Sequence, residues 1–522
     1  MQSMLNYSME RHGKEYTIYC TITGGSTLGV EGRLIQVEVD ISNGLPGINM
    51  VGLLSSEVKE AGERVRTALK NTGYTIPPKR ITVSLSPADE KKQGSSYDLP
   101  IAAAILANLG SFPIEQLNNR LMIGELGLNG AVRPVRGALA IVLEAKRLGI
   151  TRCILPKENA GEGALAGDGM EIIGVENLKQ LCSFLSGELR LPREQAVSRD
   201  SRQSGKVDFS EINGQKQLRR AAEIAAAGMH NLLMVGPPGS GKTMAARRIP
   251  TILPPLSEEE SLELTKIYSA AGLLSDNILI RERPFRAPHH NATVSALIGG
   301  GSVPKPGEVT LAVHGVLFLD ELPEFSRSSL EAMRQPLEDR IVQISRARAS
   351  YRFPADFMLV AAMNPCRCGY YPDRNRCRCS GRDIASYQGR VSQPFMDRMD
   401  LAVNAEQLTY SQIWNRTENE SSETIRRRVV QAHRLQRERY QKEDISYNSQ
   451  LLPGQIERYC AVGRGESRLL EQIYERFQLT GRGYFRILRT ARTIADLDGS
   501  QTIKKRHISE AVMLRQRRRE TE

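Results

Sequence analysis

The segment GPPGSGKT, at residues 236–243, has the residue types and spacing of a loop that binds nucleotide phosphates. It follows an apolar run, NLLMV, and precedes TMAARRI, so the sequence predicts a strand, the loop and a helix in that order. Glycines let backbone N–H groups wrap phosphate oxygens at a helix N-terminus, where the helix dipole favours anions. We expect Lys242 to reach the β- and γ-phosphates of ATP and the Thr243 hydroxyl to ligate Mg²⁺. The candidate loop contacts are Gly236, Pro237, Pro238, Gly239, Ser240, Gly241, Lys242 and Thr243.

Two carboxylates follow a second apolar run, GVLFL, which is typical of a buried strand in a parallel sheet. The carboxyl ends of parallel strands meet at one edge of a sheet, so Asp320 and Glu321 should lie beside the phosphate loop. We expect Asp320 to hold Mg²⁺ and Glu321 to polarise the attacking water as general base. A third apolar run, MLVAAM, ends in Asn364, whose amide would orient that water or contact the γ-phosphate.

Four of the eight cysteines lie within 14 residues, in the sequence CRCGYYPDRNRCRC. Four thiolates at this spacing predict a structural Zn²⁺ with no open coordination position, and neighbouring arginines would offset its negative charge. Reduced thiols without a metal remain the alternative. The clustered residues are Cys366, Cys368, Cys377 and Cys379. The scattered ones, Cys20, Cys153, Cys182 and Cys460, are predicted to be small core residues.

The elements that must position these residues divide the 522-residue chain into three predicted domains. They are an α/β unit at 1–197, a second α/β unit at 207–405 and a wholly helical region at 406–522. A polar Ser-rich linker at 198–206 separates the first two. In the first unit, strand-like runs at 34–41, 80–85 and 153–156 alternate with helical runs at 57–73, 99–110 and 136–149. No apolar run reaches the roughly 18–20 residues of a membrane span, and the N-terminus has no apolar signal region. The sequence predicts a cytoplasmic protein.

The net charge of +12 is unevenly distributed. Residues 406–522 carry 23 Lys and Arg against 16 Asp and Glu. Such an excess suits an acidic partner, with phosphate the first candidate. A solvated, soluble surface is the alternative reading.

Two loops of the second α/β unit are also basic. One is the long Gly-rich connection at 284–309, and the other is a predicted hairpin at 340–357. Basic, flexible loops suit a single-stranded phosphate backbone that is bound without base readout, although plain surface loops would look the same. The arginines concerned are Arg281, Arg283 and Arg286 around the first loop and Arg346, Arg348 and Arg352 near the tip of the second.

The spacing of the phosphate loop, the carboxylate pair and Asn364 resembles that of the AAA+ ATPases, with Asn364 at their sensor-1 position. DFSEINGQ, at 208–215, is similar to the segment that packs on adenine in that superfamily. The stretch at 283–321 and the cysteine cluster resemble the magnesium-chelatase-like family of ComM/YifB type, over essentially the whole chain. The resemblance implies a Lon-protease-like N-terminal α/β domain, a parallel P-loop AAA+ core and a C-terminal helical lid. It also implies a homo-oligomeric ring, expected to be hexameric.

The same resemblance assigns two arginines. SQPFMDRMDL matches the segment with the arginine finger, which puts at Arg398 the group that completes a neighbouring subunit's site. A guanidinium suits this role because it is always charged and binds phosphate oxygens as a fork. On sequence alone, Arg398 could equally pair with Asp397 or Asp400. The family match favours Arg482 as the sensor-2 arginine, and Arg486 is the nearest alternative.

Residues 1–190 resemble the protease domain of Lon, but the position of the Lon catalytic lysine is Leu139 here. Ser96 falls at the place of the Lon serine. A serine without a base to take its proton is a poor nucleophile. The domain is therefore predicted to serve oligomerisation or docking, without peptidase activity.

Two classes of function follow from the resemblance. The first is a ring-shaped DNA translocase or helicase that promotes branch migration in recombination of incoming DNA, acting on single-stranded or branched DNA. The alternative is a protein remodeller, as in magnesium chelatase. The net charge favours DNA, and nothing in the chain resembles a porphyrin site. The candidate DNA contacts are Arg286, Arg346 and Arg348.

Overall fold

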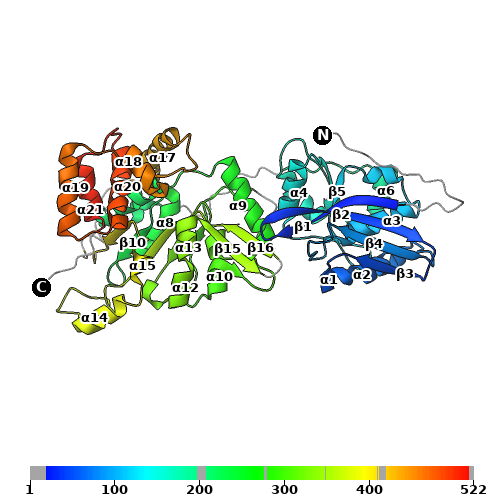
Figure 1. The fold of residues 1–522 in the computed structure, drawn as a ribbon, viewed down its shortest axis with the longest axis horizontal. Coiled ribbons are helices and arrows are strands. Elements are labelled where there is room, and N and C mark those ends of the chain that lie inside the picture. Colours follow the sequence, from blue (N-terminus) through cyan, green and yellow to red (C-terminus); the bar gives the residue numbers. More distant parts are fainter. Residues whose placement is uncertain are drawn as a thin grey trace. The chain divides into compact units, whose positions relative to one another are not determined.

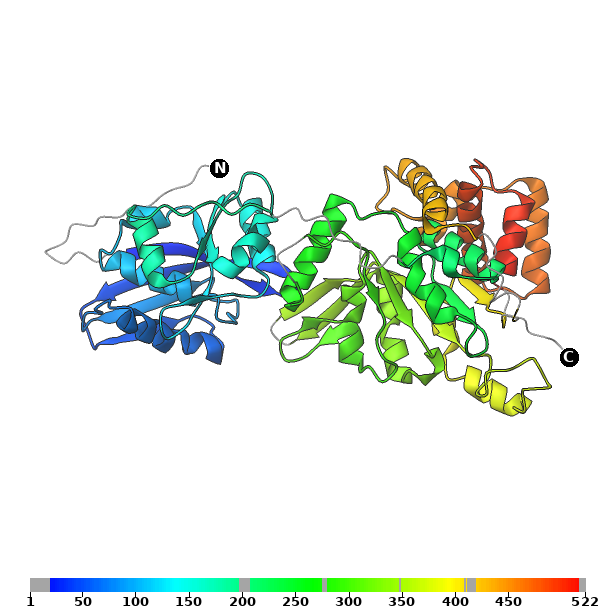
Figure 2. The ribbon, with the colours of Figure 1, turned by 180° about the vertical axis from the view of Figure 1, so that it is seen from behind.

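A computed structural model describes residues 19–196, 207–274, 279–346, 349–407, 410 and 419–515. The chain forms two compact units, drawn in Figures 1 and 2. The first consists of residues 1–199 and 265–280, and the second of residues 200–264 and 281–522. The predicted linker at 198–206 and Arg348 lie outside the described residues.

The first unit is built on a seven-stranded mixed sheet with the order β3-β4-β2-β1-β5-β8-β9. Its strands are β1 (Tyr19–Leu28), β2 (Glu31–Ser42), β3 (Gly47–Val51), β4 (Arg80–Ser86), β5 (Arg120–Met122), β8 (Arg152–Pro156) and β9 (Glu171–Val175). Its main helices are α2 (Ala61–Asn71), α3 (Asp98–Asn108), α4 (Ala138–Arg147), α5 (Lys157–Ala164) and α6 (Leu178–Leu185). β1 pairs antiparallel with β2, and β2 with β4, whereas the other neighbours are parallel. Every residue of α3 is buried, because this apolar helix forms the centre of the core.

The Lon-like serine position has no catalytic arrangement. Ser96 is buried, and its hydroxyl donates a 2.7 Å hydrogen bond to the backbone carbonyl of Gly25, which cannot take up a proton in catalysis. Leu139 is buried, and its backbone N–H donates to Glu162 Oε1 at 2.9 Å. The local contacts of both residues are therefore structural.

The second unit contains a five-stranded, wholly parallel sheet with the order β11-β14-β17-β10-β18. Its strands are β10 (Leu232–Val235), β11 (Phe285–Arg286), β14 (Val316–Leu319), β17 (Met358–Met363) and β18 (Leu401–Asn404). The apolar runs of β14 and β17 are buried throughout, as expected for central strands that are covered on both faces. Val235 lies opposite Met363, and Leu319 opposite Ala361, so these strands end at nearly the same level.

Two small hairpins lie in the segments that were predicted to be basic loops. β12 (Gly299–Gly300) pairs with β13 (Lys305–Pro306), and β15 (Ile341–Arg346) pairs with β16 (Ala349–Pro354). Short helices surround them: α10 (Val294–Ile298), α11 (Glu308–Leu311), α12 (Arg327–Ala332) and α13 (Arg334–Asp339). The predicted hairpin at 340–357 is confirmed.

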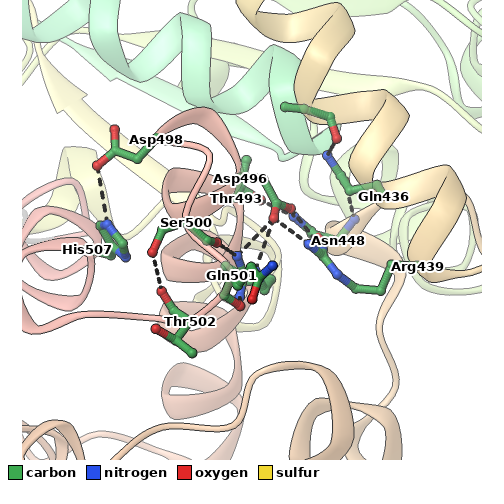
Figure 3. Close-up of polar contacts among 12 residues, drawn as sticks. Gln436, Arg439, Asn448, Thr493, Asp496, Asp498, Ser500, Gln501, Thr502 and His507 are labelled. Carbon is green, nitrogen blue, oxygen red and sulfur yellow. Dashed lines mark hydrogen bonds and ion pairs between the residues drawn. The ribbon is translucent and has the colours of Figure 1, made fainter.

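The C-terminal part is helical and shares one apolar cluster with helices α7 (Lys216–Gly228) and α8 (Lys242–Ile252) of the sheet region. Its helices are α17 (Ser422–Arg439), α18 (Pro453–Tyr459), α19 (Arg464–Arg476), α20 (Gly481–Leu497) and α21 (Lys505–Met513). A buried carboxylate ties them together. Figure 3 shows Asp496 of α20 accepting hydrogen bonds from Arg439 of α17 and from Asn448, both at 2.9 Å.

The mixed sheet, the parallel sheet and the helical C-terminal part confirm the predicted α/β fold class. None of the described helices is both long and apolar enough to cross a membrane.

Candidate functional site

The phosphate loop connects β10 to α8, as the motif predicts. Gly239 and Gly241 have φ angles of 74° and 83°, which only glycine adopts without strain. Lys242 opens α8, and 9% of its surface is exposed. Its ammonium donates to the carbonyl oxygens of Gly236 and Pro237 at 2.7 and 2.8 Å. The lysine therefore lies folded over the loop, and burial lowers its pKa from the ordinary value despite the opposing charge of Asp320.

The carboxyl ends of three strands bring the predicted partners to this loop. The Thr243 hydroxyl donates to Asp320 Oδ2 at 2.7 Å, directly after β14. Asn364 follows β17, and its Oδ1 lies 3.4 Å from Lys242 Nζ. A hydroxyl and a carboxylate oxygen are the ligand types that Mg²⁺ prefers, so the donor set of Thr243 and Asp320 fits that ion.

Glu321 has a partner that the sequence did not reveal. Its Oε2 lies 3.2 Å from Nδ1 of His290, and the His290 ring stacks on His289 with centroids 4.1 Å apart. Glu321 has a left-handed φ of 52°, which directs its backbone away from the line of β14. Both histidines belong to the long connection between β11 and α10. No spacing rule connects that segment with a carboxylate 31 residues later, and only the paired histidines in RAPHHNATV hint at a site.

Arg398 lies at the other edge of the sheet. Arg398 comes just before β18, and Leu401 of β18 pairs in parallel with Leu232 at the start of β10. Arg398 therefore lies where these strands begin, whereas Lys242 comes after the end of β10. The Arg398 guanidinium contacts the Glu338 carboxylate and the Pro394 carbonyl, and the residue is 5% exposed. The sequence allowed an ion pair of Arg398 with Asp397 or Asp400. Among the described residues, the ion-pair partner of Arg398 is Glu338 instead.

Asp400 instead anchors the arginines of α20. Its carboxylate accepts the backbone N–H of Asn231 at 3.0 Å and lies 3.6 Å from Arg486 Nε. Burial alone would raise the pKa of Asp400, but the His230 ring, whose Nδ1 lies 3.6 Å from Oδ2, and the charges of Arg486 and Arg489 hold it well below its usual range. Arg486 and Arg489 are therefore only partly accessible and do not form a fully solvated face of α20.

Arg482 is the exposed member of the row, one helical turn before Arg486. Burial is the main cause that lowers the pKa of Arg398, and the nearby charges of Arg334, Arg482 and Arg486 add to this effect. Arg398 and Arg482 therefore share one positively charged region, at the edge opposite the phosphate loop.

The four clustered thiols converge. Their sulfur atoms all lie within 4.8 Å of one another, and the Sγ of Cys366 lies 3.3 Å from that of Cys368 and 3.8 Å from that of Cys377. A tetrahedral zinc with Zn–S bonds of about 2.3 Å needs sulfur atoms about 3.8 Å apart, so the cluster fits that ion closely. The backbone N–H of Tyr370 is the main cause that lowers the pKa of Cys368 to about 6, whereas burial raises the pKa of Cys377 to about 12.

The arginines of the two basic loops, which are candidates for contacts with DNA, differ in whether they already form ion pairs within the chain. Arg286 makes a two-pronged ion pair with Glu308, at 2.7 and 2.8 Å. Arg283 is buried, and its Nη2 lies 3.1 Å from Glu260. Arg346 is exposed, and its Nη2 donates to the Gly301 carbonyl at 3.0 Å, which joins the tips of the two hairpins. Arg283 is therefore fixed by its contacts, Arg286 remains partly accessible beside Glu308, and Arg346 is the most exposed of these three cations.

Three family models match consecutive parts of the chain. The model described as magnesium chelatase, subunit ChlI, matches residues 208–413. The model described as subunit ChlI of Mg-chelatase matches residues 37–159, and the ChlI C-terminal model matches residues 419–515.

Individual relatives match over nearly the full length. The protein YifB of Salmonella typhimurium is 43% identical over 493 residues, which cover 94% of this chain and 96% of YifB. Competence protein ComM of Haemophilus influenzae is 42% identical over 492 residues, which cover 93% and 95% of the two chains. Lon protease 2 of Bacillus subtilis is 28% identical over 166 residues, or 29% of this chain and 30% of that protease.

Proposed function

Since the chain belongs to the family of the magnesium chelatase subunit ChlI, in its YifB and ComM group, we propose that it is an ATP-driven ring motor that moves single-stranded or branched DNA. Members of this family are AAA+ ATPases, and they typically form oligomers. One observation carries the hydrolytic part of the proposal. Lys242, Thr243 and Asp320 meet at one edge of a parallel sheet, where such folds bind nucleotides.

Each residue at this edge has a role that suits its chemistry. Lys242 and the backbone of residues 236–241 would hold the phosphates, and Thr243 and Asp320 would hold Mg²⁺. The bound ion would neutralise charge on the β- and γ-phosphates. Glu321 would take the proton of the attacking water, and Asn364 would orient that water.

The position of the arginines supports a ring. Arg398 and Arg482 lie at the edge where the strands begin, and Lys242 lies at the edge where they end. Both arginines would therefore act on the site of a neighbouring copy, with Arg398 as finger and Arg482 as sensor 2. A closed ring, expected to hold six copies, lets every site receive these groups.

The proposed substrate rests on charge and on the joined hairpins. The hydrogen bond from Arg346 to the Gly301 carbonyl connects the two hairpins, which would line a central pore, where phosphates could displace the carbonyl. The name of the Haemophilus influenzae relative, competence protein, fits a role in branch migration during recombination of incoming DNA. The magnesium chelatase name favours the second candidate, a motor that remodels a protein partner.

Stimulation of ATP hydrolysis by single-stranded DNA tests this proposal directly. We expect hydrolysis by the full chain to increase when unstructured oligonucleotides are added with Mg²⁺ at low salt. The stimulation should weaken steeply as salt rises, because phosphate contacts release counterions. If ATP hydrolysis does not respond to single-stranded, duplex or branched DNA, the DNA motor is contradicted and protein remodelling becomes the favoured function.

His290 is expected to restrain Glu321 in the absence of DNA. The pair lies at the surface, with 58% of the Glu321 and 29% of the His290 side chain accessible, and surface ion pairs contribute at most about 1 kcal/mol even when the histidine is protonated. His290→Ala should therefore raise the basal turnover number by no more than about fivefold. The KM for ATP should stay unchanged, since His290 does not contact the phosphate loop in the structure.

Two variants control this prediction. His290→Asn keeps an N–H donor close to the position of Nδ1 and should restore the wild-type rate. His289→Ala removes the neighbouring ring, which does not pair with Glu321, and should leave the rate unchanged. A basal rate that falls in His290→Ala would mean that the histidine supports the catalytic base instead of restraining it.

A further inference from the structure

The cysteine segment leaves the sheet at the nucleotide edge and returns to the phosphate loop. Pro365 and Cys366 directly follow Asn364. Three residues later, Gly369 lies against Pro238 of the loop. A Cβ atom on Gly369 would lie 2.5 Å from Pro238 Cδ and 3.8 Å from Asn364 Cγ. The two backbones can approach this closely because residue 369 has no side chain.

Hydrogen bonds of the backbone and of Gln388 hold that turn beside the thiols. The Gly369 N–H donates to the Cys366 carbonyl at 3.0 Å, so Gly369 closes the turn that Cys366 and Cys368 begin. Gly369 has a φ of 88°, which disfavours any other residue. Gln388, at the end of α14 (Gly381–Gln388), donates to the Pro365 carbonyl at 2.9 Å and fixes the start of the segment.

Apolar burial contributes little order to this segment, whose other contacts are hydrogen bonds and arginines that lie over Tyr370 and Tyr371. Its apolar cluster has only three buried members, namely Cys366, Cys377 and Ile384. Figure 2 shows α14, in yellow, at the periphery of the second unit. A segment with so few buried contacts opens easily unless a metal closes it, and metal binding to such a segment contributes directly to its folding.

We propose that the metal-loaded cysteine cluster is a latch that holds the phosphate loop, through the Gly369–Pro238 contact, in the conformation that binds nucleotide. The inference rests on the proposed function only in that the loop binds ATP. The loop gains from such support because its glycines lose more conformational freedom than other residues when the loop becomes ordered. A zinc site with four protein ligands is closed and rigid, so it can provide this support without taking part in the reaction.

The latch requires reciprocal coupling. If bound zinc tightens nucleotide binding by some factor, bound nucleotide must tighten zinc binding by the same factor. We expect a factor of about ten, within the usual range for such coupling. This reciprocity separates the latch from a zinc site that only stabilises the fold.

The test breaks the contact and keeps every thiol. Gly369→Ala should retain one zinc per chain by elemental analysis and bind a fluorescent ATP analogue about ten times more weakly than the wild type. Gly381→Ala is the matched control, because a Cβ there meets nothing within 4 Å and the residue opens a helix. It should bind both zinc and nucleotide like the wild type.

The reverse arm measures the equilibrium affinity for zinc by competition with a chromogenic chelator. Saturating nucleotide should tighten zinc binding to the wild type about tenfold, and it should have little effect on Gly369→Ala or on Pro238→Ala. Cys366→Ser/Cys379→Ser should lose zinc and bind nucleotide as weakly as Gly369→Ala. Thermal melting of each variant shows whether the second unit is still folded.

Three results would overturn the latch: a wild type without zinc, unchanged nucleotide affinity in Gly369→Ala, or a zinc affinity of the wild type that does not change when nucleotide is bound. A wild type that holds zinc but binds no nucleotide would overturn the proposed ATPase function itself. The two failures are therefore distinguishable.

Discussion

Arg398→Ala is expected to bind ATP almost normally and to lose hydrolysis by about 10³-fold or more, the usual effect of removing an arginine finger. The reason is the position of Arg398 at the edge of the sheet opposite Lys242, from which, under the proposed function, it completes the site of a neighbouring copy. Its own subunit keeps the whole phosphate loop, so nucleotide affinity should survive. Steady-state turnover and equilibrium binding of a fluorescent ATP analogue measure the two quantities separately.

A mixing experiment separates this role from a structural one, because Arg398 is largely buried against Glu338. Arg398→Ala and Glu321→Gln subunits, each nearly inactive alone, should regain part of the turnover when mixed. Some interfaces then combine an intact finger with an intact base. Glu338→Gln removes the partner of Arg398 within the chain and should keep turnover. A mixture that stays inactive, in assemblies shown to exchange subunits, would count against a shared site.

Replacement of both Arg346 and Arg348 by alanine is expected to abolish the stimulation of hydrolysis by DNA. Arg346 is the exposed cation at the junction of the two hairpin tips, and Arg348 lies outside the described residues. Loss of two phosphate contacts should reduce the salt dependence of single-strand binding by about 1.4 in log K per tenfold change in salt. Basal hydrolysis should persist, because neither residue belongs to the nucleotide site.

Arg434→Ala provides the matched control for this double change. It removes an exposed arginine on α17, whose partner Glu438 lies on the same helix. It should leave both the DNA stimulation and the salt dependence as they are in the wild type. If DNA still stimulates hydrolysis after both arginines are replaced, other residues contact the DNA. If the wild type shows no detectable DNA binding at low salt, protein remodelling is favoured.

The sequence alone determined the features that a short stretch of chain contains in full. The phosphate loop, its flanking strand and helix, and the Asp320–Glu321 pair could be identified because glycine spacing and buried apolar runs dictate local structure. The sequence also predicted that Lys242, Asp320 and Asn364 meet at one edge of the sheet, since parallel strands bring their carboxyl ends together. The cysteine cluster needed only the four thiols within 14 residues.

The tertiary structure decided which distant residues meet. His290 pairs with Glu321, and Arg398 pairs with Glu338 and not with the acidic residues next to it in the sequence. Gly369 lets the cysteine segment pack against the phosphate loop. None of these contacts follows from spacing, because the partners lie on different elements whose approach depends on strand order and on turns far apart in the chain. The sequence supplied the chemical groups, and the packing of the sheet determined which of them are paired and which remain accessible.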